Sequence, residues 1–365
     1  YYYNMFEFLK SYLGMGTMLG VDIGTAAIKI VEIKKTSTLP KFLNYGILKS
    51  NTHLDRPNSA IQSSALKIVE KETADLLKIL IKEANFQSRE AIASIPVFSA
   101  FITLLEMPQM PEADVAKAMA FQIKQHIPLP ISEVAIDWLK VGDKETDEGL
   151  KQQILLISIP NEIIQRYRNI FKLAGLKLKA LEIESLSLAR ALVGNDPTPT
   201  LLVDIGALST NIAVIDQGFV KLNVFSDIGG ASLTMAIANG LGINVKRAEE
   251  LKKQKGLKAG PAEYELSTLP LPYLDAIIGE TIRAKNKFER EQDKKIEKIF
   301  LAGGGANLTG IEEYFSKQIL TRQAGPSVLM GNALSGLSLS PETRILEKQL
   351  GAELAIAAGL AMKEL

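Results

Sequence analysis

Hydrophobic and polar residues alternate with two periods along this chain, and these periods predict both strands and helices. Strand-type runs predict three opening strands, at about 18–24, 27–34 and 41–48. Apolar residues recurring every three to four positions predict a helix over about 60–84. A strand follows at 91–95 and is ended by Pro96. The opening is therefore typical of an α/β lobe.

The pattern changes character after Pro96. Proline-containing turns at 107–111 and 126–131 flank a predicted amphipathic helix over 112–125. Three further strands are predicted, at 98–105, 132–141 and 153–159, with an acidic, glycine-containing loop at 142–149. A helix over 161–173 follows, with Asn161 expected as its N-cap. We interpret 98–175 as a compact α+β unit inserted into the first lobe.

The second half repeats the α/β pattern. The predicted elements are a strand at 177–183, a helix at 184–193, a proline-rich linker at 195–199, a mixed helical stretch at 230–294, a strand running from 299 into three glycines, a helix at 308–320 and a small-residue helix at 350–365. The charged segment 275–295 is expected to be solvated.

One phrase occurs twice, as Leu19-Gly-Val-Asp-Ile-Gly-Thr25 and as Leu202-Val-Asp-Ile-Gly-Ala207. Each copy ends a strand in Asp-Ile-Gly, and a second strand follows, so each predicts a hairpin. Glycine lets main-chain amides approach an oxyanion, and a carboxylate at the strand end can hold a hydrated Mg²⁺. Two such hairpins across a cleft would clamp the polyphosphate of a nucleotide from both sides.

Composition narrows the possible functions. The 365 residues are enough for two lobes, and 42 basic residues against 41 acidic ones leave no electrostatic signature of nucleic-acid binding. Cysteine is absent, which excludes disulfides and thiolate chemistry and fits a cytoplasmic protein. Histidine occurs only at His53 and His126, so a histidine-based site is not expected. No apolar run reaches the roughly 18 residues of a membrane-spanning helix.

The N-terminal segment differs from the rest of the chain. Tyr1-Tyr-Tyr-Asn4 has the character of a tag remnant, with Met5 as the expected start. The segment 5–13 is amphipathic, and we expect it to dock on its own domain rather than touch a membrane.

The chain resembles the actin-like ATPase superfamily and, within it, the PilM family of the type IV pilus assembly apparatus, which is related to FtsA. Four stretches carry the resemblance: Asp22 to Glu32, Asp204 to Asn211, Ile127 to Trp138, and Gly229 to Thr234 with Arg247 to Lys252. It implies an α/β, actin-like (ribonuclease H-like) two-lobed ATPase fold with an FtsA/PilM-type inserted subdomain.

The same resemblance implies a division of the chain. Subdomain 1A would comprise 17–97 and 176–199, interrupted by the inserted subdomain 1C at 98–175. Subdomain 2A would comprise 200–228 and 296–349, interrupted by subdomain 2B at 229–295. The helix at 350–365 would return to 1A, and 1–16 would comprise the tag remnant and the short amphipathic segment.

The resemblance also assigns roles in a site for ATP or ADP with Mg²⁺. The metal would be held through water by Asp22 and Asp204. The cofactor would be bound by Gly24, Thr25, Lys29, Gly206, Ser209, Thr210, Asn211, Glu249, Lys252, Gly303, Gly304 and Gly305. Glu184 stands where relatives place a water-orienting carboxylate. Three plainer interpretations stay open: Lys29 as a solvent-facing lysine, Glu249 and Lys252 as a solvated helix pair, and Glu184 as a first-turn helix acid.

The function implied is that of a cytoplasmic ATP-binding scaffold, peripheral to the inner membrane through its partners, with slow or partner-dependent hydrolysis. It would bind the N-terminal cytoplasmic tail of PilN, other platform proteins and the motor ATPases, and could assemble into a ring. Two alternatives are an FtsA-like division tether or filament protein and a small-molecule kinase. We expect neither, because the sequence to Leu365 shows no linker with a membrane helix and no catalytic substrate subdomain.

Overall fold

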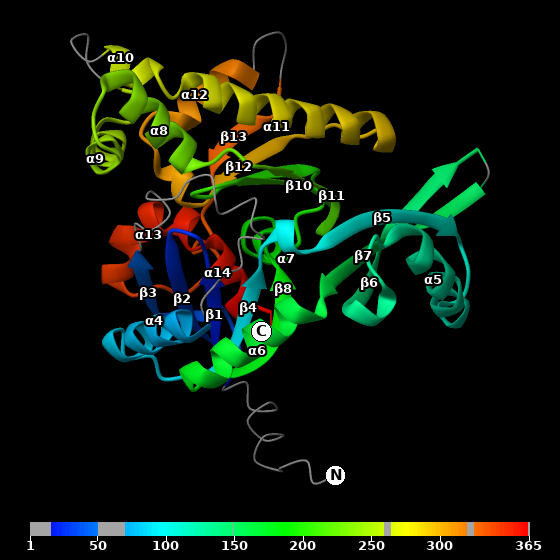
Figure 1. Ribbon diagram of the computed structural model, residues 1–365. Helices are drawn as coiled ribbons and strands as arrows, with labels where there is room; N and C mark the ends of the chain where they lie inside the picture. The colour runs from blue at the N-terminus through cyan, green and yellow to red at the C-terminus, as the bar shows by residue number, and fades with distance from the viewer. Residues whose placement is uncertain (1–15, 50–69, 148, 259–263, 320–324, 364–365) are drawn as a thin grey trace.

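Two five-stranded sheets form the centres of two lobes in the computed structural model, which describes residues 16–49, 70–147, 149–258, 264–319 and 325–363 (Figure 1). The first sheet has the order β3-β2-β1-β4-β8. Its strands are β1 (Thr17–Ile23), β2 (Ala27–Lys34), β3 (Lys41–Lys49), β4 (Glu90–Ile95) and β8 (Lys177–Ile183). Its helices are α4 (Glu70–Glu83), α6 (Asn161–Ala174) and α7 (Glu184–Leu192).

The second sheet has the order β11-β10-β9-β12-β13. Its strands are β9 (Thr200–Ile205), β10 (Thr210–Asp216), β11 (Phe219–Ser226), β12 (Lys298–Ala302) and β13 (Ser327–Met330). Its helices are α8 (Gly230–Leu241), α9 (Val245–Lys255), α10 (Tyr264–Thr268), α11 (Leu271–Gln292) and α12 (Ile311–Ile319).

The two sheets share one plan. In each, a strand ending in Asp-Ile pairs antiparallel with the next strand and parallel with a later one, β1 with β2 and β4, and β9 with β10 and β12. Strands β1 and β9 are buried along most of their length because helices cover both faces. The duplicated phrase thus marks a duplicated lobe, and the prediction of two α/β lobes is confirmed.

A small antiparallel sheet projects from the first lobe between β4 and α6 (Figure 1). It has the order β5-β7-β6, with β5 (Phe101–Pro108), β6 (Val134–Thr146), β7 (Gly149–Pro160) and helix α5 (Glu112–His126) against one face. We call these residues, 101–160, the inserted subdomain. Leu105, Met119 and Leu156 are central in its core. The loop predicted at 142–149 is wrong, since β6 extends to Thr146, which pairs with Gly149 of β7.

Helix α6 lies in the first lobe instead of the inserted unit where the sequence placed it. Tyr167 and Phe171 are fully buried in the same core as Leu19 and Leu77, because the apolar face of α6 packs on α4 and the sheet. The prediction of Asn161 as N-cap is also wrong. Pro160 holds that position, and the side chain of Asn161 donates through Nδ2 to the Ser132 carbonyl at 3.1 Å.

The C-terminal helix is longer and broken. It consists of α13 (Pro341–Glu353) and α14 (Ala355–Ala361), separated at Leu354, instead of one helix from residue 350. Helix α14 is buried and packs on α7 and β1, where Gly20 faces the Ala357 carbonyl. Only glycine permits that approach, because a Cβ at position 20 would collide with the carbonyl.

Helix α11 is half buried, unlike the solvated helix that its charges predicted. Leu274, Ile277 and Phe288 lie in the core of the second lobe, and the charged residues cover the opposite face. The predicted segments 1–15 and 60–69 lie outside the described residues. Within the described part of the chain, no helix combines the length and apolar character needed to cross a membrane.

Candidate functional site

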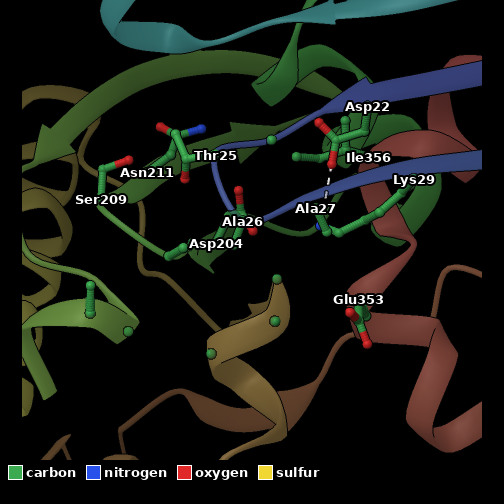
Figure 2. Close-up of a pocket in the computed structure, with 18 of the residues that line it drawn as sticks. Asp22, Thr25, Ala26, Ala27, Lys29, Asp204, Ser209, Asn211, Glu353 and Ile356 are labelled. Atoms are coloured by element: carbon green, nitrogen blue, oxygen red, sulfur yellow. Dashed lines mark hydrogen bonds and ion pairs between the residues drawn. The ribbon is translucent and has the colours of Figure 1, made fainter. Parts of the chain in front are cut away.

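A cavity of about 440 Å³ lies between the two lobes (Figure 2). Its walls come from the turns after β1 and β9, the start of α7, helices α8 and α9, the glycine turn after β12, and the end of α13. Every site residue predicted from the sequence lines it except Thr210. The hydroxyl of Thr210 donates to the Ile228 carbonyl at 2.7 Å, which gives this residue a structural contact away from the cavity.

The first hairpin places a lysine beside a carboxylate. Asp22 lies opposite Lys29 in the β1–β2 register, and their side chains form an ion pair at 3.3 Å (Figure 2). Ser94 donates to the other oxygen of Asp22 at 3.0 Å. Burial would lower the pKa of Lys29, but Asp22, Asp204 and Glu353 raise it overall. Lys29 is therefore a cation of the cavity and not a solvent-facing lysine.

The second hairpin has an amide at the matching position. Asp204 lies opposite Asn211 in the β9–β10 register. Burial raises the pKa of Asp204 to about 6, against the opposing effect of Lys29. Asn211 donates through Nδ2 to Ser185 at 3.2 Å, and among the described residues its Oδ1 is buried without a partner. The second hairpin thus presents the carboxylate of Asp204 and Oδ1 of Asn211 and contains no cation opposite Asp204.

The glycine amides of the two turns are used within the turns. Gly24 donates to Ala27 at 3.0 Å, and Gly206 donates to Ser209 at 2.9 Å. Within the described contacts, the main-chain amides of Thr25, Ala26 and Ala207 have no hydrogen-bond acceptor. These amides, one or two residues beyond each glycine, are the ones free for a phosphate oxygen.

Glu184 begins α7 at the floor of the cavity. The Val97 amide donates to its carboxyl group at 3.4 Å. Burial, together with Asp22 and Asp204, raises the pKa of Glu184 well above its usual value. A carboxyl group that keeps its proton can orient water, but it is a poor acceptor for the proton that water loses.

Glu249 and Lys252 lie inside the cavity wall rather than in solvent. They form an ion pair at 2.7 Å, and Lys252 also donates to the Gly230 carbonyl at 2.8 Å. Although burial opposes ionisation, Lys252 and the hydroxyl of Thr234 lower the pKa of Glu249 to about 2. The pair therefore fixes α9 on the start of α8 and offers a ligand only its remaining hydrogen-bonding capacity.

The three glycines after β12 have different surroundings. Gly303 has a φ of 80°, and a Cβ there would meet the carboxylate of Asp204. A Cβ at Gly305 would meet the side chain of Ile205, whereas Gly304 faces open space. Two of the glycines thus let this turn pack on the end of β9, and only Gly304 leaves room toward the cavity.

Several lining residues had no signal in the sequence. They are Phe98, Phe225, Asn307, Gln349 and Glu353. Glu353 reaches the cavity from the end of α13, where its carboxylate lies 3.8 Å from Lys49 (Figure 2). Only the return of α13 to the cleft brings it near Lys29, so no local pattern could identify it.

The donor set suits a hard cation held through water. The charges of Asp22 and Asp204 raise the pKa of Glu184, and the charge of Asp22 raises the pKa of Asp204. In the described residues no three acidic or histidine side chains come close enough to coordinate a metal directly. Oxygen donors and water-mediated contact are what Mg²⁺ uses in nucleotide sites.

Comparison with known families decides the relationship. The family described as type IV pilus assembly protein PilM matches residues 20–365. The chain belongs to this family. Its members' pilus assembly role is thereby the role of this chain.

Individual proteins are also similar to the chain in sequence or in fold. The cell division protein FtsA of Enterococcus hirae is 22% identical over 331 residues, covering 81% of this chain and 75% of FtsA. A solved PilM–PilN type IV pilus biogenesis complex has a TM-score of 0.78 at 22% identity, covering 95% of this chain and 98% of that chain. The ethanolamine utilization protein EutJ of Carboxydothermus hydrogenoformans has a TM-score of 0.55 at 17% identity, covering 95% and 90%.

Proposed function

We propose that this chain binds ATP or ADP with Mg²⁺ between its lobes and, in that form, acts as a cytoplasmic scaffold that binds the N-terminal tail of PilN at the inner-membrane platform. The observation that carries the nucleotide part is the cavity itself. Two hairpins with carboxylates at their strand ends face it from opposite lobes, and unpaired turn amides lie beside each carboxylate.

A divalent cation fits the charge of this site. Asp204 is a carboxylate whose pKa is raised by burial and by the charge of Asp22, so a cation beside it would favour its ionised form. Asp22 and Asp204 would hold the ion through water, and Lys29 would contact phosphate. When bound, the ion would neutralise phosphate charge. The turn amides of Thr25, Ala26 and Ala207 would then orient the phosphates.

Hydrolysis is expected to be slow. Glu184 is the carboxyl group at the floor of the cavity, and its environment favours the protonated form. We therefore expect turnover of the isolated protein below about 1 per second, the lower end of ordinary enzyme rates. Fast single-turnover hydrolysis that disappears in Glu184→Gln would overturn this expectation and make Glu184 a catalytic residue.

The nucleotide proposal is tested by calorimetry of Mg-ATP binding to the Asp22→Ala/Asp204→Ala double variant. Affinity should fall by at least roughly 10- to 100-fold, the usual effect of losing groups that orient a metal through its ligands. Asp216→Ala, which removes a buried carboxylate at the far end of β10, is the matched control. Unchanged Mg-ATP affinity in the double variant would refute the clamp.

The inserted subdomain supplies a plausible surface for the tail of PilN. Strand β6 is an edge of its sheet, and Trp138 and Leu139, which are adjacent and thus on opposite faces, are 39% and 44% exposed. An extended tail would add a strand to this edge through main-chain hydrogen bonds, and every second side chain of the tail would pack against the inserted subdomain. The PilM–PilN complex among the structural relatives supports PilN as the partner.

Deleting the inserted subdomain tests the partner proposal. Phe101 pairs with Ser158, so the ends of the subdomain are adjacent and a short linker can replace 101–160 while α6 is kept. The deletion variant should retain Mg-ATP binding and lose capture of a synthetic PilN tail peptide. A point variant, Trp138→Ala/Leu139→Ser, should weaken capture, whereas Leu150→Ser, equally exposed at the hairpin end, should not. Full capture by the deletion variant would move the tail site to the first lobe.

A further inference from the structure

Strand β11 of the second lobe lies against the inserted subdomain, which is covalently part of the first (Figure 1). Val220 of β11 shares one apolar core with Val141 of β6 and Leu155 of β7. Strand β11 contacts both β5 and β6. The inserted sheet is thus attached to one lobe by the chain and to the other by packing.

A buried lysine adds directional hydrogen bonds to this apolar contact. Lys221 of β11 is 6% exposed, and its Nζ donates to the Val141 carbonyl at 2.5 Å and to Oε1 of Gln153 at 2.8 Å. Gln153 in turn donates to Gln292 at the end of α11, at 3.1 Å. Two strands of the inserted sheet are therefore hydrogen-bonded to two elements of the second lobe.

Two β-bulges make this contact possible. The β6–β7 register skips Val141, which leaves its carbonyl outside the ladder, and the β10–β11 register skips Lys221. Bulges of this kind redirect a side chain out of the regular pleat. Gly142, with a φ of 150°, completes the arrangement, because a Cβ there would lie 2.6 Å from Nζ of Lys221. The contact between β11 and the inserted sheet therefore depends on backbone irregularities in both strands, β6 and β11.

The other end of β11 forms part of the nucleotide cavity. Phe225 lines the cavity and contacts Phe98 of the first lobe, with ring centroids 5.6 Å apart. Between the two ends, Asn223 accepts a hydrogen bond from Ser185, which accepts one from Asn211. Lys221, Asn223 and Phe225 occupy every second position of β11, and each contacts a residue outside the second lobe.

We propose that β11 couples the nucleotide cavity to the inserted subdomain, with Lys221 as the residue that makes the inserted sheet move with the second lobe. The coupling rests on the proposed nucleotide function. A ligand that changes the angle between the lobes strains either the covalent attachment of the inserted sheet or its contact with β11. Directional hydrogen bonds from a buried cation resist sliding that an apolar contact alone would permit.

Pairs of spin labels measure the motion directly, since the chain has no cysteine of its own. Glu145→Cys in the inserted sheet is paired with Lys82→Cys in α4 or with Lys287→Cys in α11, and all three positions are exposed. With Mg-AMPPNP, the wild-type background should show a shifted 145–82 distance and a constant 145–287 distance. In Lys221→Met the pattern should reverse, because the inserted sheet then follows the first lobe.

Two further variants separate the explanations. Lys294→Met removes a neighbouring lysine that pairs with Asp216 at 2.7 Å, and it should behave as wild type. Gly142→Ala displaces Lys221 from the side of the inserted sheet and should behave as Lys221→Met. The coupling is refuted if wild type binds nucleotide but Lys221→Met keeps the wild-type pattern, or if neither distance responds in any variant. Calorimetry showing no nucleotide binding to wild type would instead refute the proposed function, and the coupling with it.

Discussion

The two hairpins that face the cavity have the same backbone and different charge. Asp22 and Asp204 occupy equivalent register positions, but Asp22 has a lysine opposite and Asp204 has an asparagine. The first carboxylate is therefore neutralised within its own lobe. The second is buried with a raised pKa, and Lys29, whose charge lowers this pKa, comes from the other lobe. The two copies of the hairpin thus differ in charge: the first contains a cation for its carboxylate, and the second does not.

The strongest way to break this comparison is to make the second hairpin like the first. Asn211→Lys places a cation opposite Asp204, so the protein should need the metal less. We expect the ratio of ATP affinities with and without Mg²⁺ to fall by roughly tenfold. Calorimetry in Mg²⁺ and in EDTA measures this ratio. Asn211→Met, which is uncharged, is the control, and an equal fall in both variants would show that charge is not the cause.

Neutralising each carboxylate in turn should change the stability of the nucleotide-free protein with opposite signs. Asp204→Asn removes a buried charge that lacks compensation, so the free energy of unfolding at pH 7 should rise by about 1–3 kcal/mol. Asp22→Asn leaves Lys29 and Ser94 without their charged partner, and stability should fall by about 2 kcal/mol. Urea unfolding measures both. Changes of the same sign would mean that the two carboxylates experience similar environments.

Lys221 is a third buried charge, and it extends the comparison to a cation whose hydrogen-bond partners, the Val141 carbonyl and Gln153, are neutral. Burial lowers the pKa of Lys221 to about 8, against the opposing effect of Asp216 and Asp143, while Lys294 lowers it further. The unfolded chain binds this proton more tightly than the folded one, so the group's contribution to stability should rise with pH between about 8 and 10.5. Unfolding of wild type minus Lys221→Met at pH 7, 8, 9 and 10 should show this increase, and a flat difference would contradict it.

The sequence by itself determined the duplication, most strand positions and the two Asp-Ile-Gly turns that line the cavity. Asp-Ile-Gly at a strand end is a local signal, since the residues that end the strand, form the turn and face the ligand are neighbours in the chain. The resemblance to the family assigned Lys29 and Asn211 to the site, and each lies on the strand that follows its turn. Register in a hairpin follows from the turn, so the residue opposite each aspartate is fixed within ten positions.

Local patterns failed where two distant surfaces meet. The charges of α11 predicted a solvated helix and the acidic residues after Val141 predicted a loop, but packing and the pairing of β6 with β7 decided otherwise. The placement of α6 in the first lobe likewise depends on its contact with α4.

Only the tertiary structure decided the electrostatics of the site. Whether Glu353 reaches the cavity and whether Lys221 is buried between the second lobe and the inserted sheet both depend on segments far apart in the chain. Burial and the charges brought near by folding set the pKa of a buried group, and neither is encoded within one turn of a helix or one strand.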